Sequence, residues 1–429
     1  MTASRDDCLA LDARDPLAPL REQFSLPPGT IYLDGNSLGV LPRATPARVA
    51  HVVQHEWGTD LIKSWNTAGW IDLPQRIGDK IARLVGADPG ELVVADSTSV
   101  NLFKVLSAAL HITQVDAPAR RVIVSERSNF PTDLYIAEAL ARERGFELVL
   151  LEHEQFEARL AAGDVALLML TQVNYRNGRL HDMARLTRVA HENGALAVWD
   201  LAHSAGALPV QLKACEADFA VGCGYKYLNG GPGAPAFVWV HPKHAERFWQ
   251  PLAGWMGHAA PFEFTPQYRP APGIARYLCG TPALLSMAAL ECGVDSVLAA
   301  EPLGGTAALR AKSLALTDLF IALVEERCAG HGLTPVTPRE HAERGSQVCL
   351  SRDEGGNVQG AGNGAYAIVQ ALIARGVIGD FRAPDVLRFG FTPLYASFGE
   401  VWDAVEHLRQ VLASGEWREA RFNTRAAVT

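Results

Sequence analysis

The chain has 429 residues, of which 48% are hydrophobic and 20% are charged. This composition is that of an ordinary globular protein and excludes a disordered or collagen-like chain, and the length predicts two or three domains. Thirty-nine Lys and Arg residues against 47 Asp and Glu residues give a net charge of −8. Neither nucleic acid nor an anionic membrane is therefore an expected partner.

The seven cysteines are scattered along the chain and form no CxxC pair, so neither a disulfide framework nor a metal site is expected. The N-terminal segment MTASRDDCLALDARD carries two adjacent acidic residues where a signal peptide needs basic ones. No uncharged apolar run reaches ~18 residues, the length that a membrane span requires. We therefore expect a reduced, cytoplasmic protein.

Short apolar runs alternate with helix-like segments through the first two thirds of the chain. Near-continuous runs of Val, Leu and Ile are typical of strands that are buried on both faces. Helices are predicted between them, for example over 132–145 and 183–194, each ending in a glycine. This alternation predicts an α/β domain with a mainly parallel, seven-stranded sheet. The predicted strands lie within 91–97, 120–126, 147–153, 165–173, 196–202, 218–228 and 236–242.

The pattern changes near residue 305. A long amphipathic helix, LRAKSLALTDLFIALVEER, precedes the strand-like SQVCLS, a helix, the strand-like VLRFGFTP and a final helix. This order predicts a smaller α+β domain. The N-terminal residues are expected to pack with it, because they precede the pattern of the large domain. We predict a large domain over 45–305 and a small domain made of 1–44 and 306–429.

Two polar residues at the ends of neighbouring predicted strands carry most of the chemical information. One strand ends in Asp200 and the next in Tyr225 and Lys226, and ligands of open α/β sheets bind outside the carboxyl ends of strands. Pyridoxal phosphate (PLP) needs an amine for its aldehyde and a carboxylate for its ring nitrogen. Taken singly, the lysine would be a solvated strand end and the aspartate a helix cap. We interpret the pair as a PLP site.

The phosphate of such a cofactor must be held without a standard loop, because the chain has neither a Walker-type motif nor GxGxxG. The segment DSTSVN (96–101) follows a predicted strand and opens a helix. Its backbone N–H groups and the hydroxyls of Thr98 and Ser99 would form an anion cup, or the segment is a plain N-cap. After the next strand, Phe130 could stack on the pyridine ring and Asp133 could add a second carboxylate, or this segment is simply a helix start.

Nine longer motifs extend these observations over nearly the whole chain, and with them the chain resembles the kynureninase family of fold-type-I PLP enzymes. DLAHSAG followed by YKYLNGGPG and then GWxGH is specific to that family. Cysteine desulfurases share the strand–Asp–helix–strand–Lys plan but lack GWxGH and the NSLG start. The matching segments lie at 32–42, 96–103, 129–133, 199–209, 224–237, 254–258, 277–285, 343–347 and 387–398.

The resemblance implies a cofactor site that is shared between two subunits. Lys226, Asp200 and Tyr225 are the implied catalytic residues: the Schiff-base lysine, the partner of the pyridine nitrogen, and a phosphate ligand that is also a candidate proton donor. Trp255 and Thr281 are expected to reach the phosphate from the second subunit of a homodimer with active sites at its interface. The other implied cofactor contacts are Thr98, Ser99, Phe130, Pro131, Thr132, Asp133, Thr171 and His203.

The resemblance also implies an activity: hydrolysis of L-kynurenine, and of its 3-hydroxy form, by cleavage of the Cβ–Cγ bond. The products would be L-alanine and anthranilate or 3-hydroxyanthranilate, in tryptophan degradation and NAD biosynthesis. Ser37 and Arg388 are the implied substrate contacts, with Arg388 taking the amino-acid carboxylate in a two-pronged pair. Without the resemblance, Arg388 would be interpreted as a surface strand arginine. Trp65 and His258 either contact the aryl group or are structural.

Two other functions remain as alternatives. A cysteine desulfurase or another fold-type-I enzyme would share the PLP site, but a desulfurase needs a nucleophilic cysteine on a mobile loop. Cys328 and Cys349 lie in roughly that part of the chain, and neither sits in a loop rich in glycine and serine. A PLP-binding regulator would need a DNA-binding domain, and no helix-turn-helix segment or basic patch is predicted.

Overall fold

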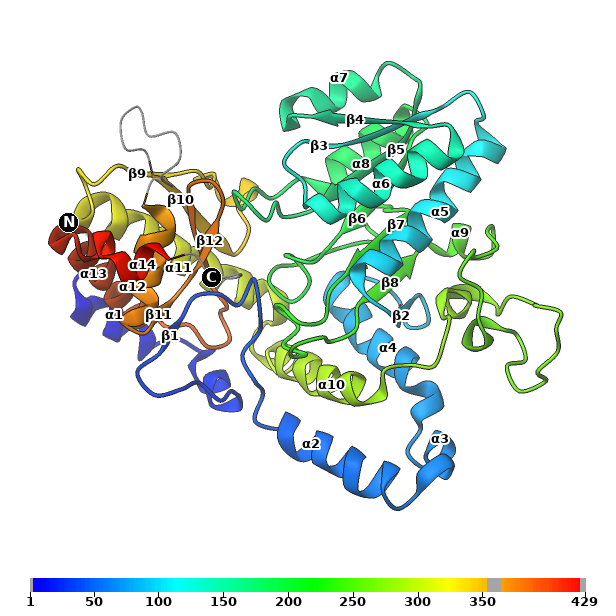
Figure 1. Ribbon diagram of the computed structural model, residues 1–429, viewed down its shortest axis with the longest axis horizontal. Coiled ribbons are helices and arrows are strands. Elements are labelled where there is room, and N and C mark those ends of the chain that lie inside the picture. Colours follow the sequence, from blue (N-terminus) through cyan, green and yellow to red (C-terminus); the bar gives the residue numbers. More distant parts are fainter. Residues whose placement is uncertain (1–2, 353–363, 425–429) are drawn as a thin grey trace. The chain divides into compact units, whose positions relative to one another are not determined.

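The computed structural model describes residues 3–352 and 364–424. The chain divides into two compact units (Figure 1). The first comprises Ala44–Tyr175 and His181–Asp295, and the second comprises Met1–Arg43, Arg176–Leu180 and Ser296–Thr429.

A seven-stranded sheet forms the centre of the first unit, in the order β2-β8-β7-β6-β5-β3-β4. All neighbouring strands are parallel except β8, which runs antiparallel to both β2 and β7. The prediction of a mainly parallel α/β sheet is thus confirmed. The strands are β2 (Leu92–Val94), β3 (Val122–Glu126), β4 (Glu147–Leu151), β5 (Val165–Thr171), β6 (Leu196–Asp200), β7 (Phe219–Gly222) and β8 (Phe237–Val240).

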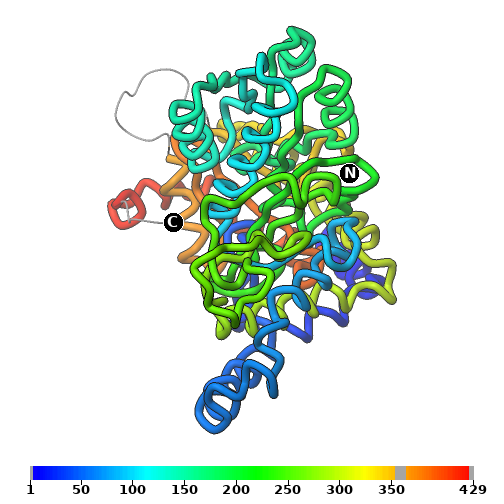
Figure 2. Tube along the Cα trace, turned by 90° about the vertical axis from the view of Figure 1, so that its right-hand side faces the viewer, coloured from blue at the N-terminus to red at the C-terminus, as the bar shows by residue number. Residues whose placement is uncertain are grey.

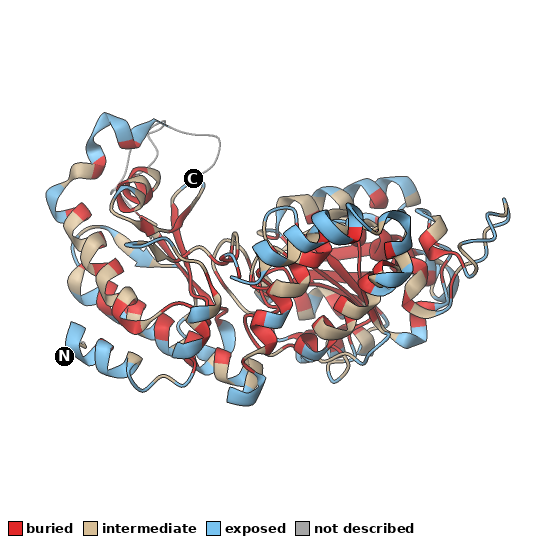
Figure 3. Cartoon of the chain, turned by 90° about the horizontal axis from the view of Figure 1, so that it is seen from below, coloured by how far each residue is buried: buried red, intermediate tan, exposed pale blue. Residues whose placement is uncertain are grey.

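Helices cover this sheet, and the core lies between them and the strands (Figure 3). Buried side chains of α5, such as Leu102 and Leu106, pack with Val198 and Val221 of the central strands. The segment from α2 to α3 extends away from the sheet in two perpendicular views (Figures 1 and 2). The helices are α2 (Thr45–His51), α3 (Ser64–Thr67), α4 (Leu73–Val85), α5 (Thr98–Asp116), α6 (Pro131–Arg144), α7 (Phe156–Leu160), α8 (Met183–Glu192), α9 (Pro242–Ala245) and α10 (Leu284–Leu298), the last of which continues into the second unit.

The second unit has a four-stranded antiparallel sheet in the order β12-β13-β10-β9. A short parallel pair, β1 (Ile31–Tyr32) with β11 (Val377–Ile378), joins the N-terminal segment to the C-terminal part of the chain. The remaining elements are α1 (Arg5–Asp12), α11 (Gly305–Arg327), β9 (Leu333–Pro335), β10 (Gln347–Arg352), α12 (Ala365–Ala374), β12 (Asp380–Arg382), β13 (Val386–Gly390), α13 (Phe398–Ser414) and α14 (Ala420–Asn423).

Within the described ranges, no helix has both the length and the apolar character needed to cross a membrane. Among the same residues, no cluster of His, Cys, Asp and Glu side chains is arranged to hold a metal ion.

Candidate active site

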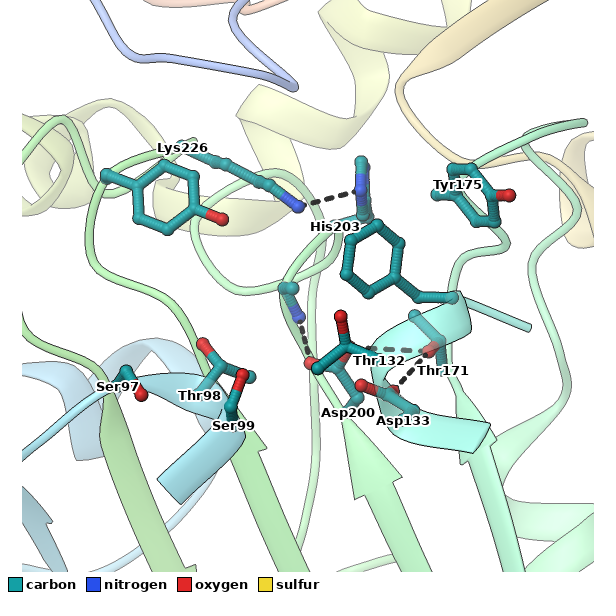
Figure 4. A pocket seen from close by; sticks show the side chains of 13 residues that line it. Ser97, Thr98, Ser99, Thr132, Asp133, Thr171, Tyr175, Asp200, His203 and Lys226 are labelled. Atoms are coloured by element: carbon teal, nitrogen blue, oxygen red, sulfur yellow. Dashed lines mark hydrogen bonds between the residues drawn. The ribbon is translucent and has the colours of Figure 1, made fainter. Parts of the chain in front are cut away.

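A pocket of about 140 Å³ opens at the carboxyl ends of β5 and β6, where the sequence predicted a ligand site (Figure 4). It collects side chains from the ends of β5 and β6, from the loops that follow β5, β6 and β7, and from the starts of α5 and α6. Its lining residues are Ser97, Thr98, Ser99, Phe130, Thr132, Asp133, Thr171, Tyr175, Asp200, Ala202, His203, Tyr225 and Lys226.

Lys226 points into the pocket from the loop that follows β7. The strand ends at Gly222, so the expectation that Lys226 ends the strand itself is wrong by a few residues. The loop folds back tightly, because Gly230 donates a backbone hydrogen bond to Gly224 and Asn229 donates one to Lys226. The Nζ atom of Lys226 lies 2.9 Å from Nε2 of the buried His203. This contact fixes the amine at the mouth of the pocket.

Gly224 shows why this loop needs glycine. A Cβ atom at this position would lie 2.4 Å from the carbonyl oxygen of Pro235, a contact that no side chain tolerates. The close approach of the two backbone segments holds the loop that carries Tyr225 and Lys226 against the sheet.

Two carboxyl groups lie at the bottom of the pocket. The Thr171 hydroxyl, at the end of β5, is 3.3 Å from Oδ2 of Asp200 and 3.4 Å from Oδ2 of Asp133. Burial raises the pKa of both carboxyl groups. The charge of Asp200 raises the pKa of Asp133 further, whereas the charge of Lys226 opposes the rise at Asp200. Such a pair favours a proton or a cationic group between its members.

The start of α5 bears on the two interpretations of the segment DSTSVN (96–101), which is either an anion cup or a plain N-cap. Ser97 is the N-cap, and its side chain accepts a hydrogen bond from the backbone N–H of Val100 at 3.3 Å. Thr98 and Ser99 form the first helical turn and line the pocket. The positive end of a 19-residue helix therefore faces the pocket together with two hydroxyl groups.

Aromatic rings border the pocket. Phe130 precedes α6 and meets Tyr175 edge to face, with ring centroids 5.3 Å apart. The Tyr225 ring lies beside the Lys226 amine, 5.7 Å from Nζ to the ring centroid. Three lining residues, Ser97, Tyr175 and Ala202, are not among those predicted from the sequence. Tyr175 lies four residues beyond β5 on the same side of the sheet as Asp200, so the strand-end rule could have found it.

The donor set fits PLP. The aldehyde of PLP requires an amine, and its ring nitrogen requires a carboxyl partner such as the buried pair with raised pKa values. Its ring face requires an aromatic ring, and its phosphate requires a helix N-terminus with hydroxyl groups. The pocket contains all four kinds of partner. Every predicted cofactor residue lines the pocket except Pro131, which is in the first turn of α6, and the pair Trp255 and Thr281.

Trp255 lies instead in an apolar groove of about 840 Å³ in the same unit. Trp65 lines this groove as well, with its ring centroid 5.8 Å from that of Trp255. Thr281 is exposed. His258 is buried, its Nε2 is 3.1 Å from the Gln267 carbonyl oxygen, and its Nδ1 accepts from the Ala260 N–H at 2.9 Å. Both ring nitrogens of His258 thus have partners near it in the chain, which favours its structural interpretation.

Arg388 lies in the second unit, in the centre of the antiparallel sheet. Its guanidinium donates to the Ser37 hydroxyl at 2.6 Å and forms a buried ion pair with Asp380. Arg382 also pairs with Asp380, at 2.6 Å. Only 1% of Arg388 is exposed, so it is not a surface strand arginine. Burial and the charge of Asp380 raise the pKa of the nearby Asp34 to about 7.

Comparisons with known proteins agree with this geometry. The model of the aminotransferase class-V family matches residues 31–329, and that of the kynureninase C-terminal domain matches residues 309–408. The chain is 57% identical to a kynureninase of Pseudomonas fluorescens and 56% identical to one of Burkholderia pseudomallei strain 1106a. Each match covers 99% of this chain and 100% of the relative. The chain belongs to the kynureninase family. The recognition made from the sequence motifs is therefore confirmed, and the cofactor is PLP.

Solved structures show the same fold at lower identity. A cysteine desulfurase of Thermococcus onnurineus NA1 has a TM-score of 0.74 and 20% identity, over 92% of this chain and 98% of that chain. A mutant of C-DES with glycine covalently linked to its PLP cofactor has a TM-score of 0.75 and 18% identity, with the same coverage. At this identity the likeness demonstrates the shared fold-type-I architecture alone.

Proposed function

We propose that this chain hydrolyses L-kynurenine to anthranilate and L-alanine by PLP-dependent cleavage of the Cβ–Cγ bond. The observation that carries the proposal is the convergence of Lys226 with Asp200 and Asp133 in one pocket, in a chain that shares 57% of its residues with a kynureninase over its full length. Bound PLP supplies an electron sink for the charge that develops at the substrate Cα.

Lys226 has two roles in this proposal. It would supply the amine that holds the cofactor, and its amine is placed to act as the base that accepts the Cα proton of the substrate. His203, 2.9 Å away, orients the amine through a hydrogen bond. Tyr225, beside Lys226, is the candidate that donates a proton to Cβ after cleavage.

Asp200 and Asp133 would together hold the ring nitrogen of bound PLP in its protonated form. Burial raises the pKa of both carboxyl groups, so the pair binds a proton readily. The protonated ring nitrogen of PLP would take the place of this proton beside the two carboxylates. The 2.8 Å hydrogen bond from the Ala202 N–H to Asp200 Oδ1 keeps that carboxyl group oriented.

The substrate contacts are proposed in the second unit. Arg388 and Ser37 bind the amino-acid carboxylate, and Asp380 holds the guanidinium in place for it. Asp380→Asn is therefore expected to raise KM for L-kynurenine with little change in kcat. Trp65 offers an apolar surface to the aryl ring.

A cytoplasmic homodimer is the proposed assembly. The groove lined by Trp65 and Trp255 includes exposed Ile62, Phe262 and Phe264, which are 76%, 61% and 78% exposed. Exposed apolar patches of this kind mark association sites. A second copy that covers this groove would bring Trp255 and Thr281 to the phosphate of its neighbour.

The alternative activity, desulfuration of cysteine, needs a reactive thiolate. Cys328 and Cys349 are buried, and burial raises the pKa of their thiols to about 12 and about 11, respectively. Neither thiol is suited to accept sulfur from a substrate.

The test is direct. The purified protein with PLP is expected to be yellow and to release fluorescent anthranilate from L-kynurenine, with no sulfide from L-cysteine. Lys226→Ala is expected to lower kcat by about 10³-fold or more, in line with loss of an acid–base group. Full turnover by this variant, or sulfide release by the wild type, would overturn the proposal. Parallel rates on 3-hydroxy-L-kynurenine measure the preference between the two substrates.

A further inference from the structure

Lys104 is a fully buried charged residue that the reaction does not use. It lies on α5, two turns beyond the phosphate cup, and none of its surface is exposed. Its Nζ donates to Oδ2 of Asp96 at 2.5 Å and to the carbonyl oxygen of Tyr277 at 2.5 Å. Removing an ammonium group from water is expensive unless its partners are well placed, so these contacts have a strong structural effect.

Asp96 is the residue that turns the chain from β2 into α5. Its φ of +47° is in the left-handed region, which is uncommon for residues other than glycine and which aspartate adopts more readily than most. Its backbone oxygen accepts from the Ala236 N–H at 2.9 Å, and its side chain reaches Lys104. The next three residues are the N-cap Ser97 and the cup residues Thr98 and Ser99. The Lys104–Asp96 pair therefore sets the direction in which the cup faces.

The second partner of Lys104 lies at the start of another functional segment. Tyr277 ends a short 3-10 helix and is followed by the residues that lead to Thr281. Within that segment, the Cys279 carbonyl oxygen accepts from the Met256 N–H at 3.2 Å, next to Trp255. One buried ammonium thus contacts both the residue that precedes the cup and the residue that precedes the segment leading to Thr281.

We propose that Lys104 is a positioning residue for the cofactor phosphate, which acts by holding Asp96 and Tyr277 and makes no contact with the cofactor itself. The proposal rests on the proposed function only in that the cup binds the phosphate of PLP. It predicts a loss of affinity specific to the phosphate, whereas an ion pair that serves only the fold would affect stability alone.

Lys312 offers a matched control in the second unit. It too is a buried lysine, paired with Asp15 at 2.7 Å and with the Pro393 carbonyl oxygen at 2.7 Å. Lys312→Met removes the same kind of ion pair at a position that no cofactor contact shares.

The experiment titrates the apo forms of the wild type, Lys104→Met and Lys312→Met with PLP and, separately, with pyridoxal, which lacks the phosphate. Lys104→Met is expected to raise the Kd for PLP about tenfold or more and to leave the Kd for pyridoxal within about twofold, because hydrogen bonds to a charged group are lost around the cup alone. Lys312→Met is expected to lower Tm with the Kd for PLP unchanged.

Equal losses of PLP and pyridoxal affinity, or an unchanged Kd for PLP in Lys104→Met, would overturn the proposal. If Lys104→Met does not fold, Asp96→Asn tests the same turn, because asparagine also adopts a positive φ and keeps an acceptor for Lys104 while it removes the charge of the pair. A selective loss of PLP affinity is again expected. Turnover of kynurenine plays no part in these readouts. Failure of the proposed function would appear as absent anthranilate release, with the affinities still measurable.

Discussion

A buried aspartate lies at each end of the central strands of the sheet. The pKa values of the two carboxyl groups are shifted in opposite directions from the usual value. Asp200 ends β6 on the side of the pocket, and burial raises its pKa. Asp218 immediately precedes β7 on the opposite side. It is at least as buried, yet its pKa is held well below its usual range.

The partners explain the difference. Burial alone would raise the pKa of Asp218, but four groups surround its carboxylate. His191 lies at 2.7 Å, His244 at 2.8 Å and Lys243 at 2.9 Å, and the Ala197 N–H donates at 2.8 Å. Asp200 has a backbone N–H, a threonine hydroxyl and a second carboxyl group as its close neighbours.

An aspartate at one end of the strands therefore has a different role from an aspartate at the other end. Asp218 is fully satisfied within the protein and ties α8 and α9 to the start of β6 and β7. Burial raises the pKa of Asp200 and Asp133, and a bound cation would offset the cost of ionising them. Asp218 therefore contributes to the stability of the fold, whereas Asp200 and Asp133 provide a site that can bind a cationic group.

The largest effect is expected at Asp200. Asp200→Asn keeps the shape of the side chain but cannot hold a proton on the ring nitrogen, so kcat is expected to fall about 10³-fold. Anthranilate release gives kcat, and thermal denaturation of the apo form tests the fold. Because the substitution removes one of two like charges, Tm should not fall. A variant with a lowered Tm and near-normal kcat would reverse the roles assigned to the two sides.

The converse substitution is Asp218→Ala. It leaves two histidines and a lysine around a buried gap, and loss of one partner of a buried ion pair costs about 3–5 kcal/mol. The midpoint of urea denaturation is expected to shift accordingly, with kcat per folded site within about twofold of the wild type. An unchanged midpoint would show that the cluster is not a stabilising element.

The pH dependence of stability is expected to differ between the two sides. The folded-state pKa of Asp133 and Asp200 lies above the unfolded value near 4, so the folded apo protein binds more protons and loses stability as the pH rises above ~4. Asp218 has the opposite sign: its contribution is present above ~4 and is lost as the pH falls below that value.

Asp133→Asn isolates the pocket side of this comparison. It removes a carboxyl group whose pKa is raised by burial, so the apo variant is expected to melt above the wild type at pH 8, with the difference shrinking towards pH 5. Differential scanning calorimetry of both apo proteins measures it. A difference that grows towards acid pH would contradict the sign of the shift.

The smallest effect is expected at His191. A quarter of its side chain is exposed, against 5% for His244, although both histidines bind Asp218. His191→Gln keeps a hydrogen-bond donor near water and is expected to cost about 1 kcal/mol of stability. His244→Gln should cost more, because the ring fills a buried space stacked on Phe219. Equal denaturation midpoints would refute this ranking.

Much of the architecture follows from the amino-acid sequence. Apolar runs buried on both faces, separated by helices that end at glycines such as Gly145, predict the parallel sheet, because the periodicity of a segment records how its own residues are buried. Asp200 ends one strand and Lys226 follows the next, which predicts that they meet, because parallel neighbours present their carboxyl ends at the same edge of the sheet.

Other features depend on distances in space that no local pattern encodes. Three contacts join residues of separate elements. Asp133 lies close to Asp200, and Arg388 is buried against Asp380. Lys104 binds Asp96 and Tyr277. The opposite titration of Asp200 and Asp218 is the clearest case: each lies beside a buried strand, and the sequence around them does not show which charges will surround them. The sequence by itself determined the strands, the helices and the chemistry of the residues at their ends, through local burial and motifs. Only the tertiary structure decided the partners of each buried charge, because these come from elements far apart along the chain, and the partners decide what the charge does.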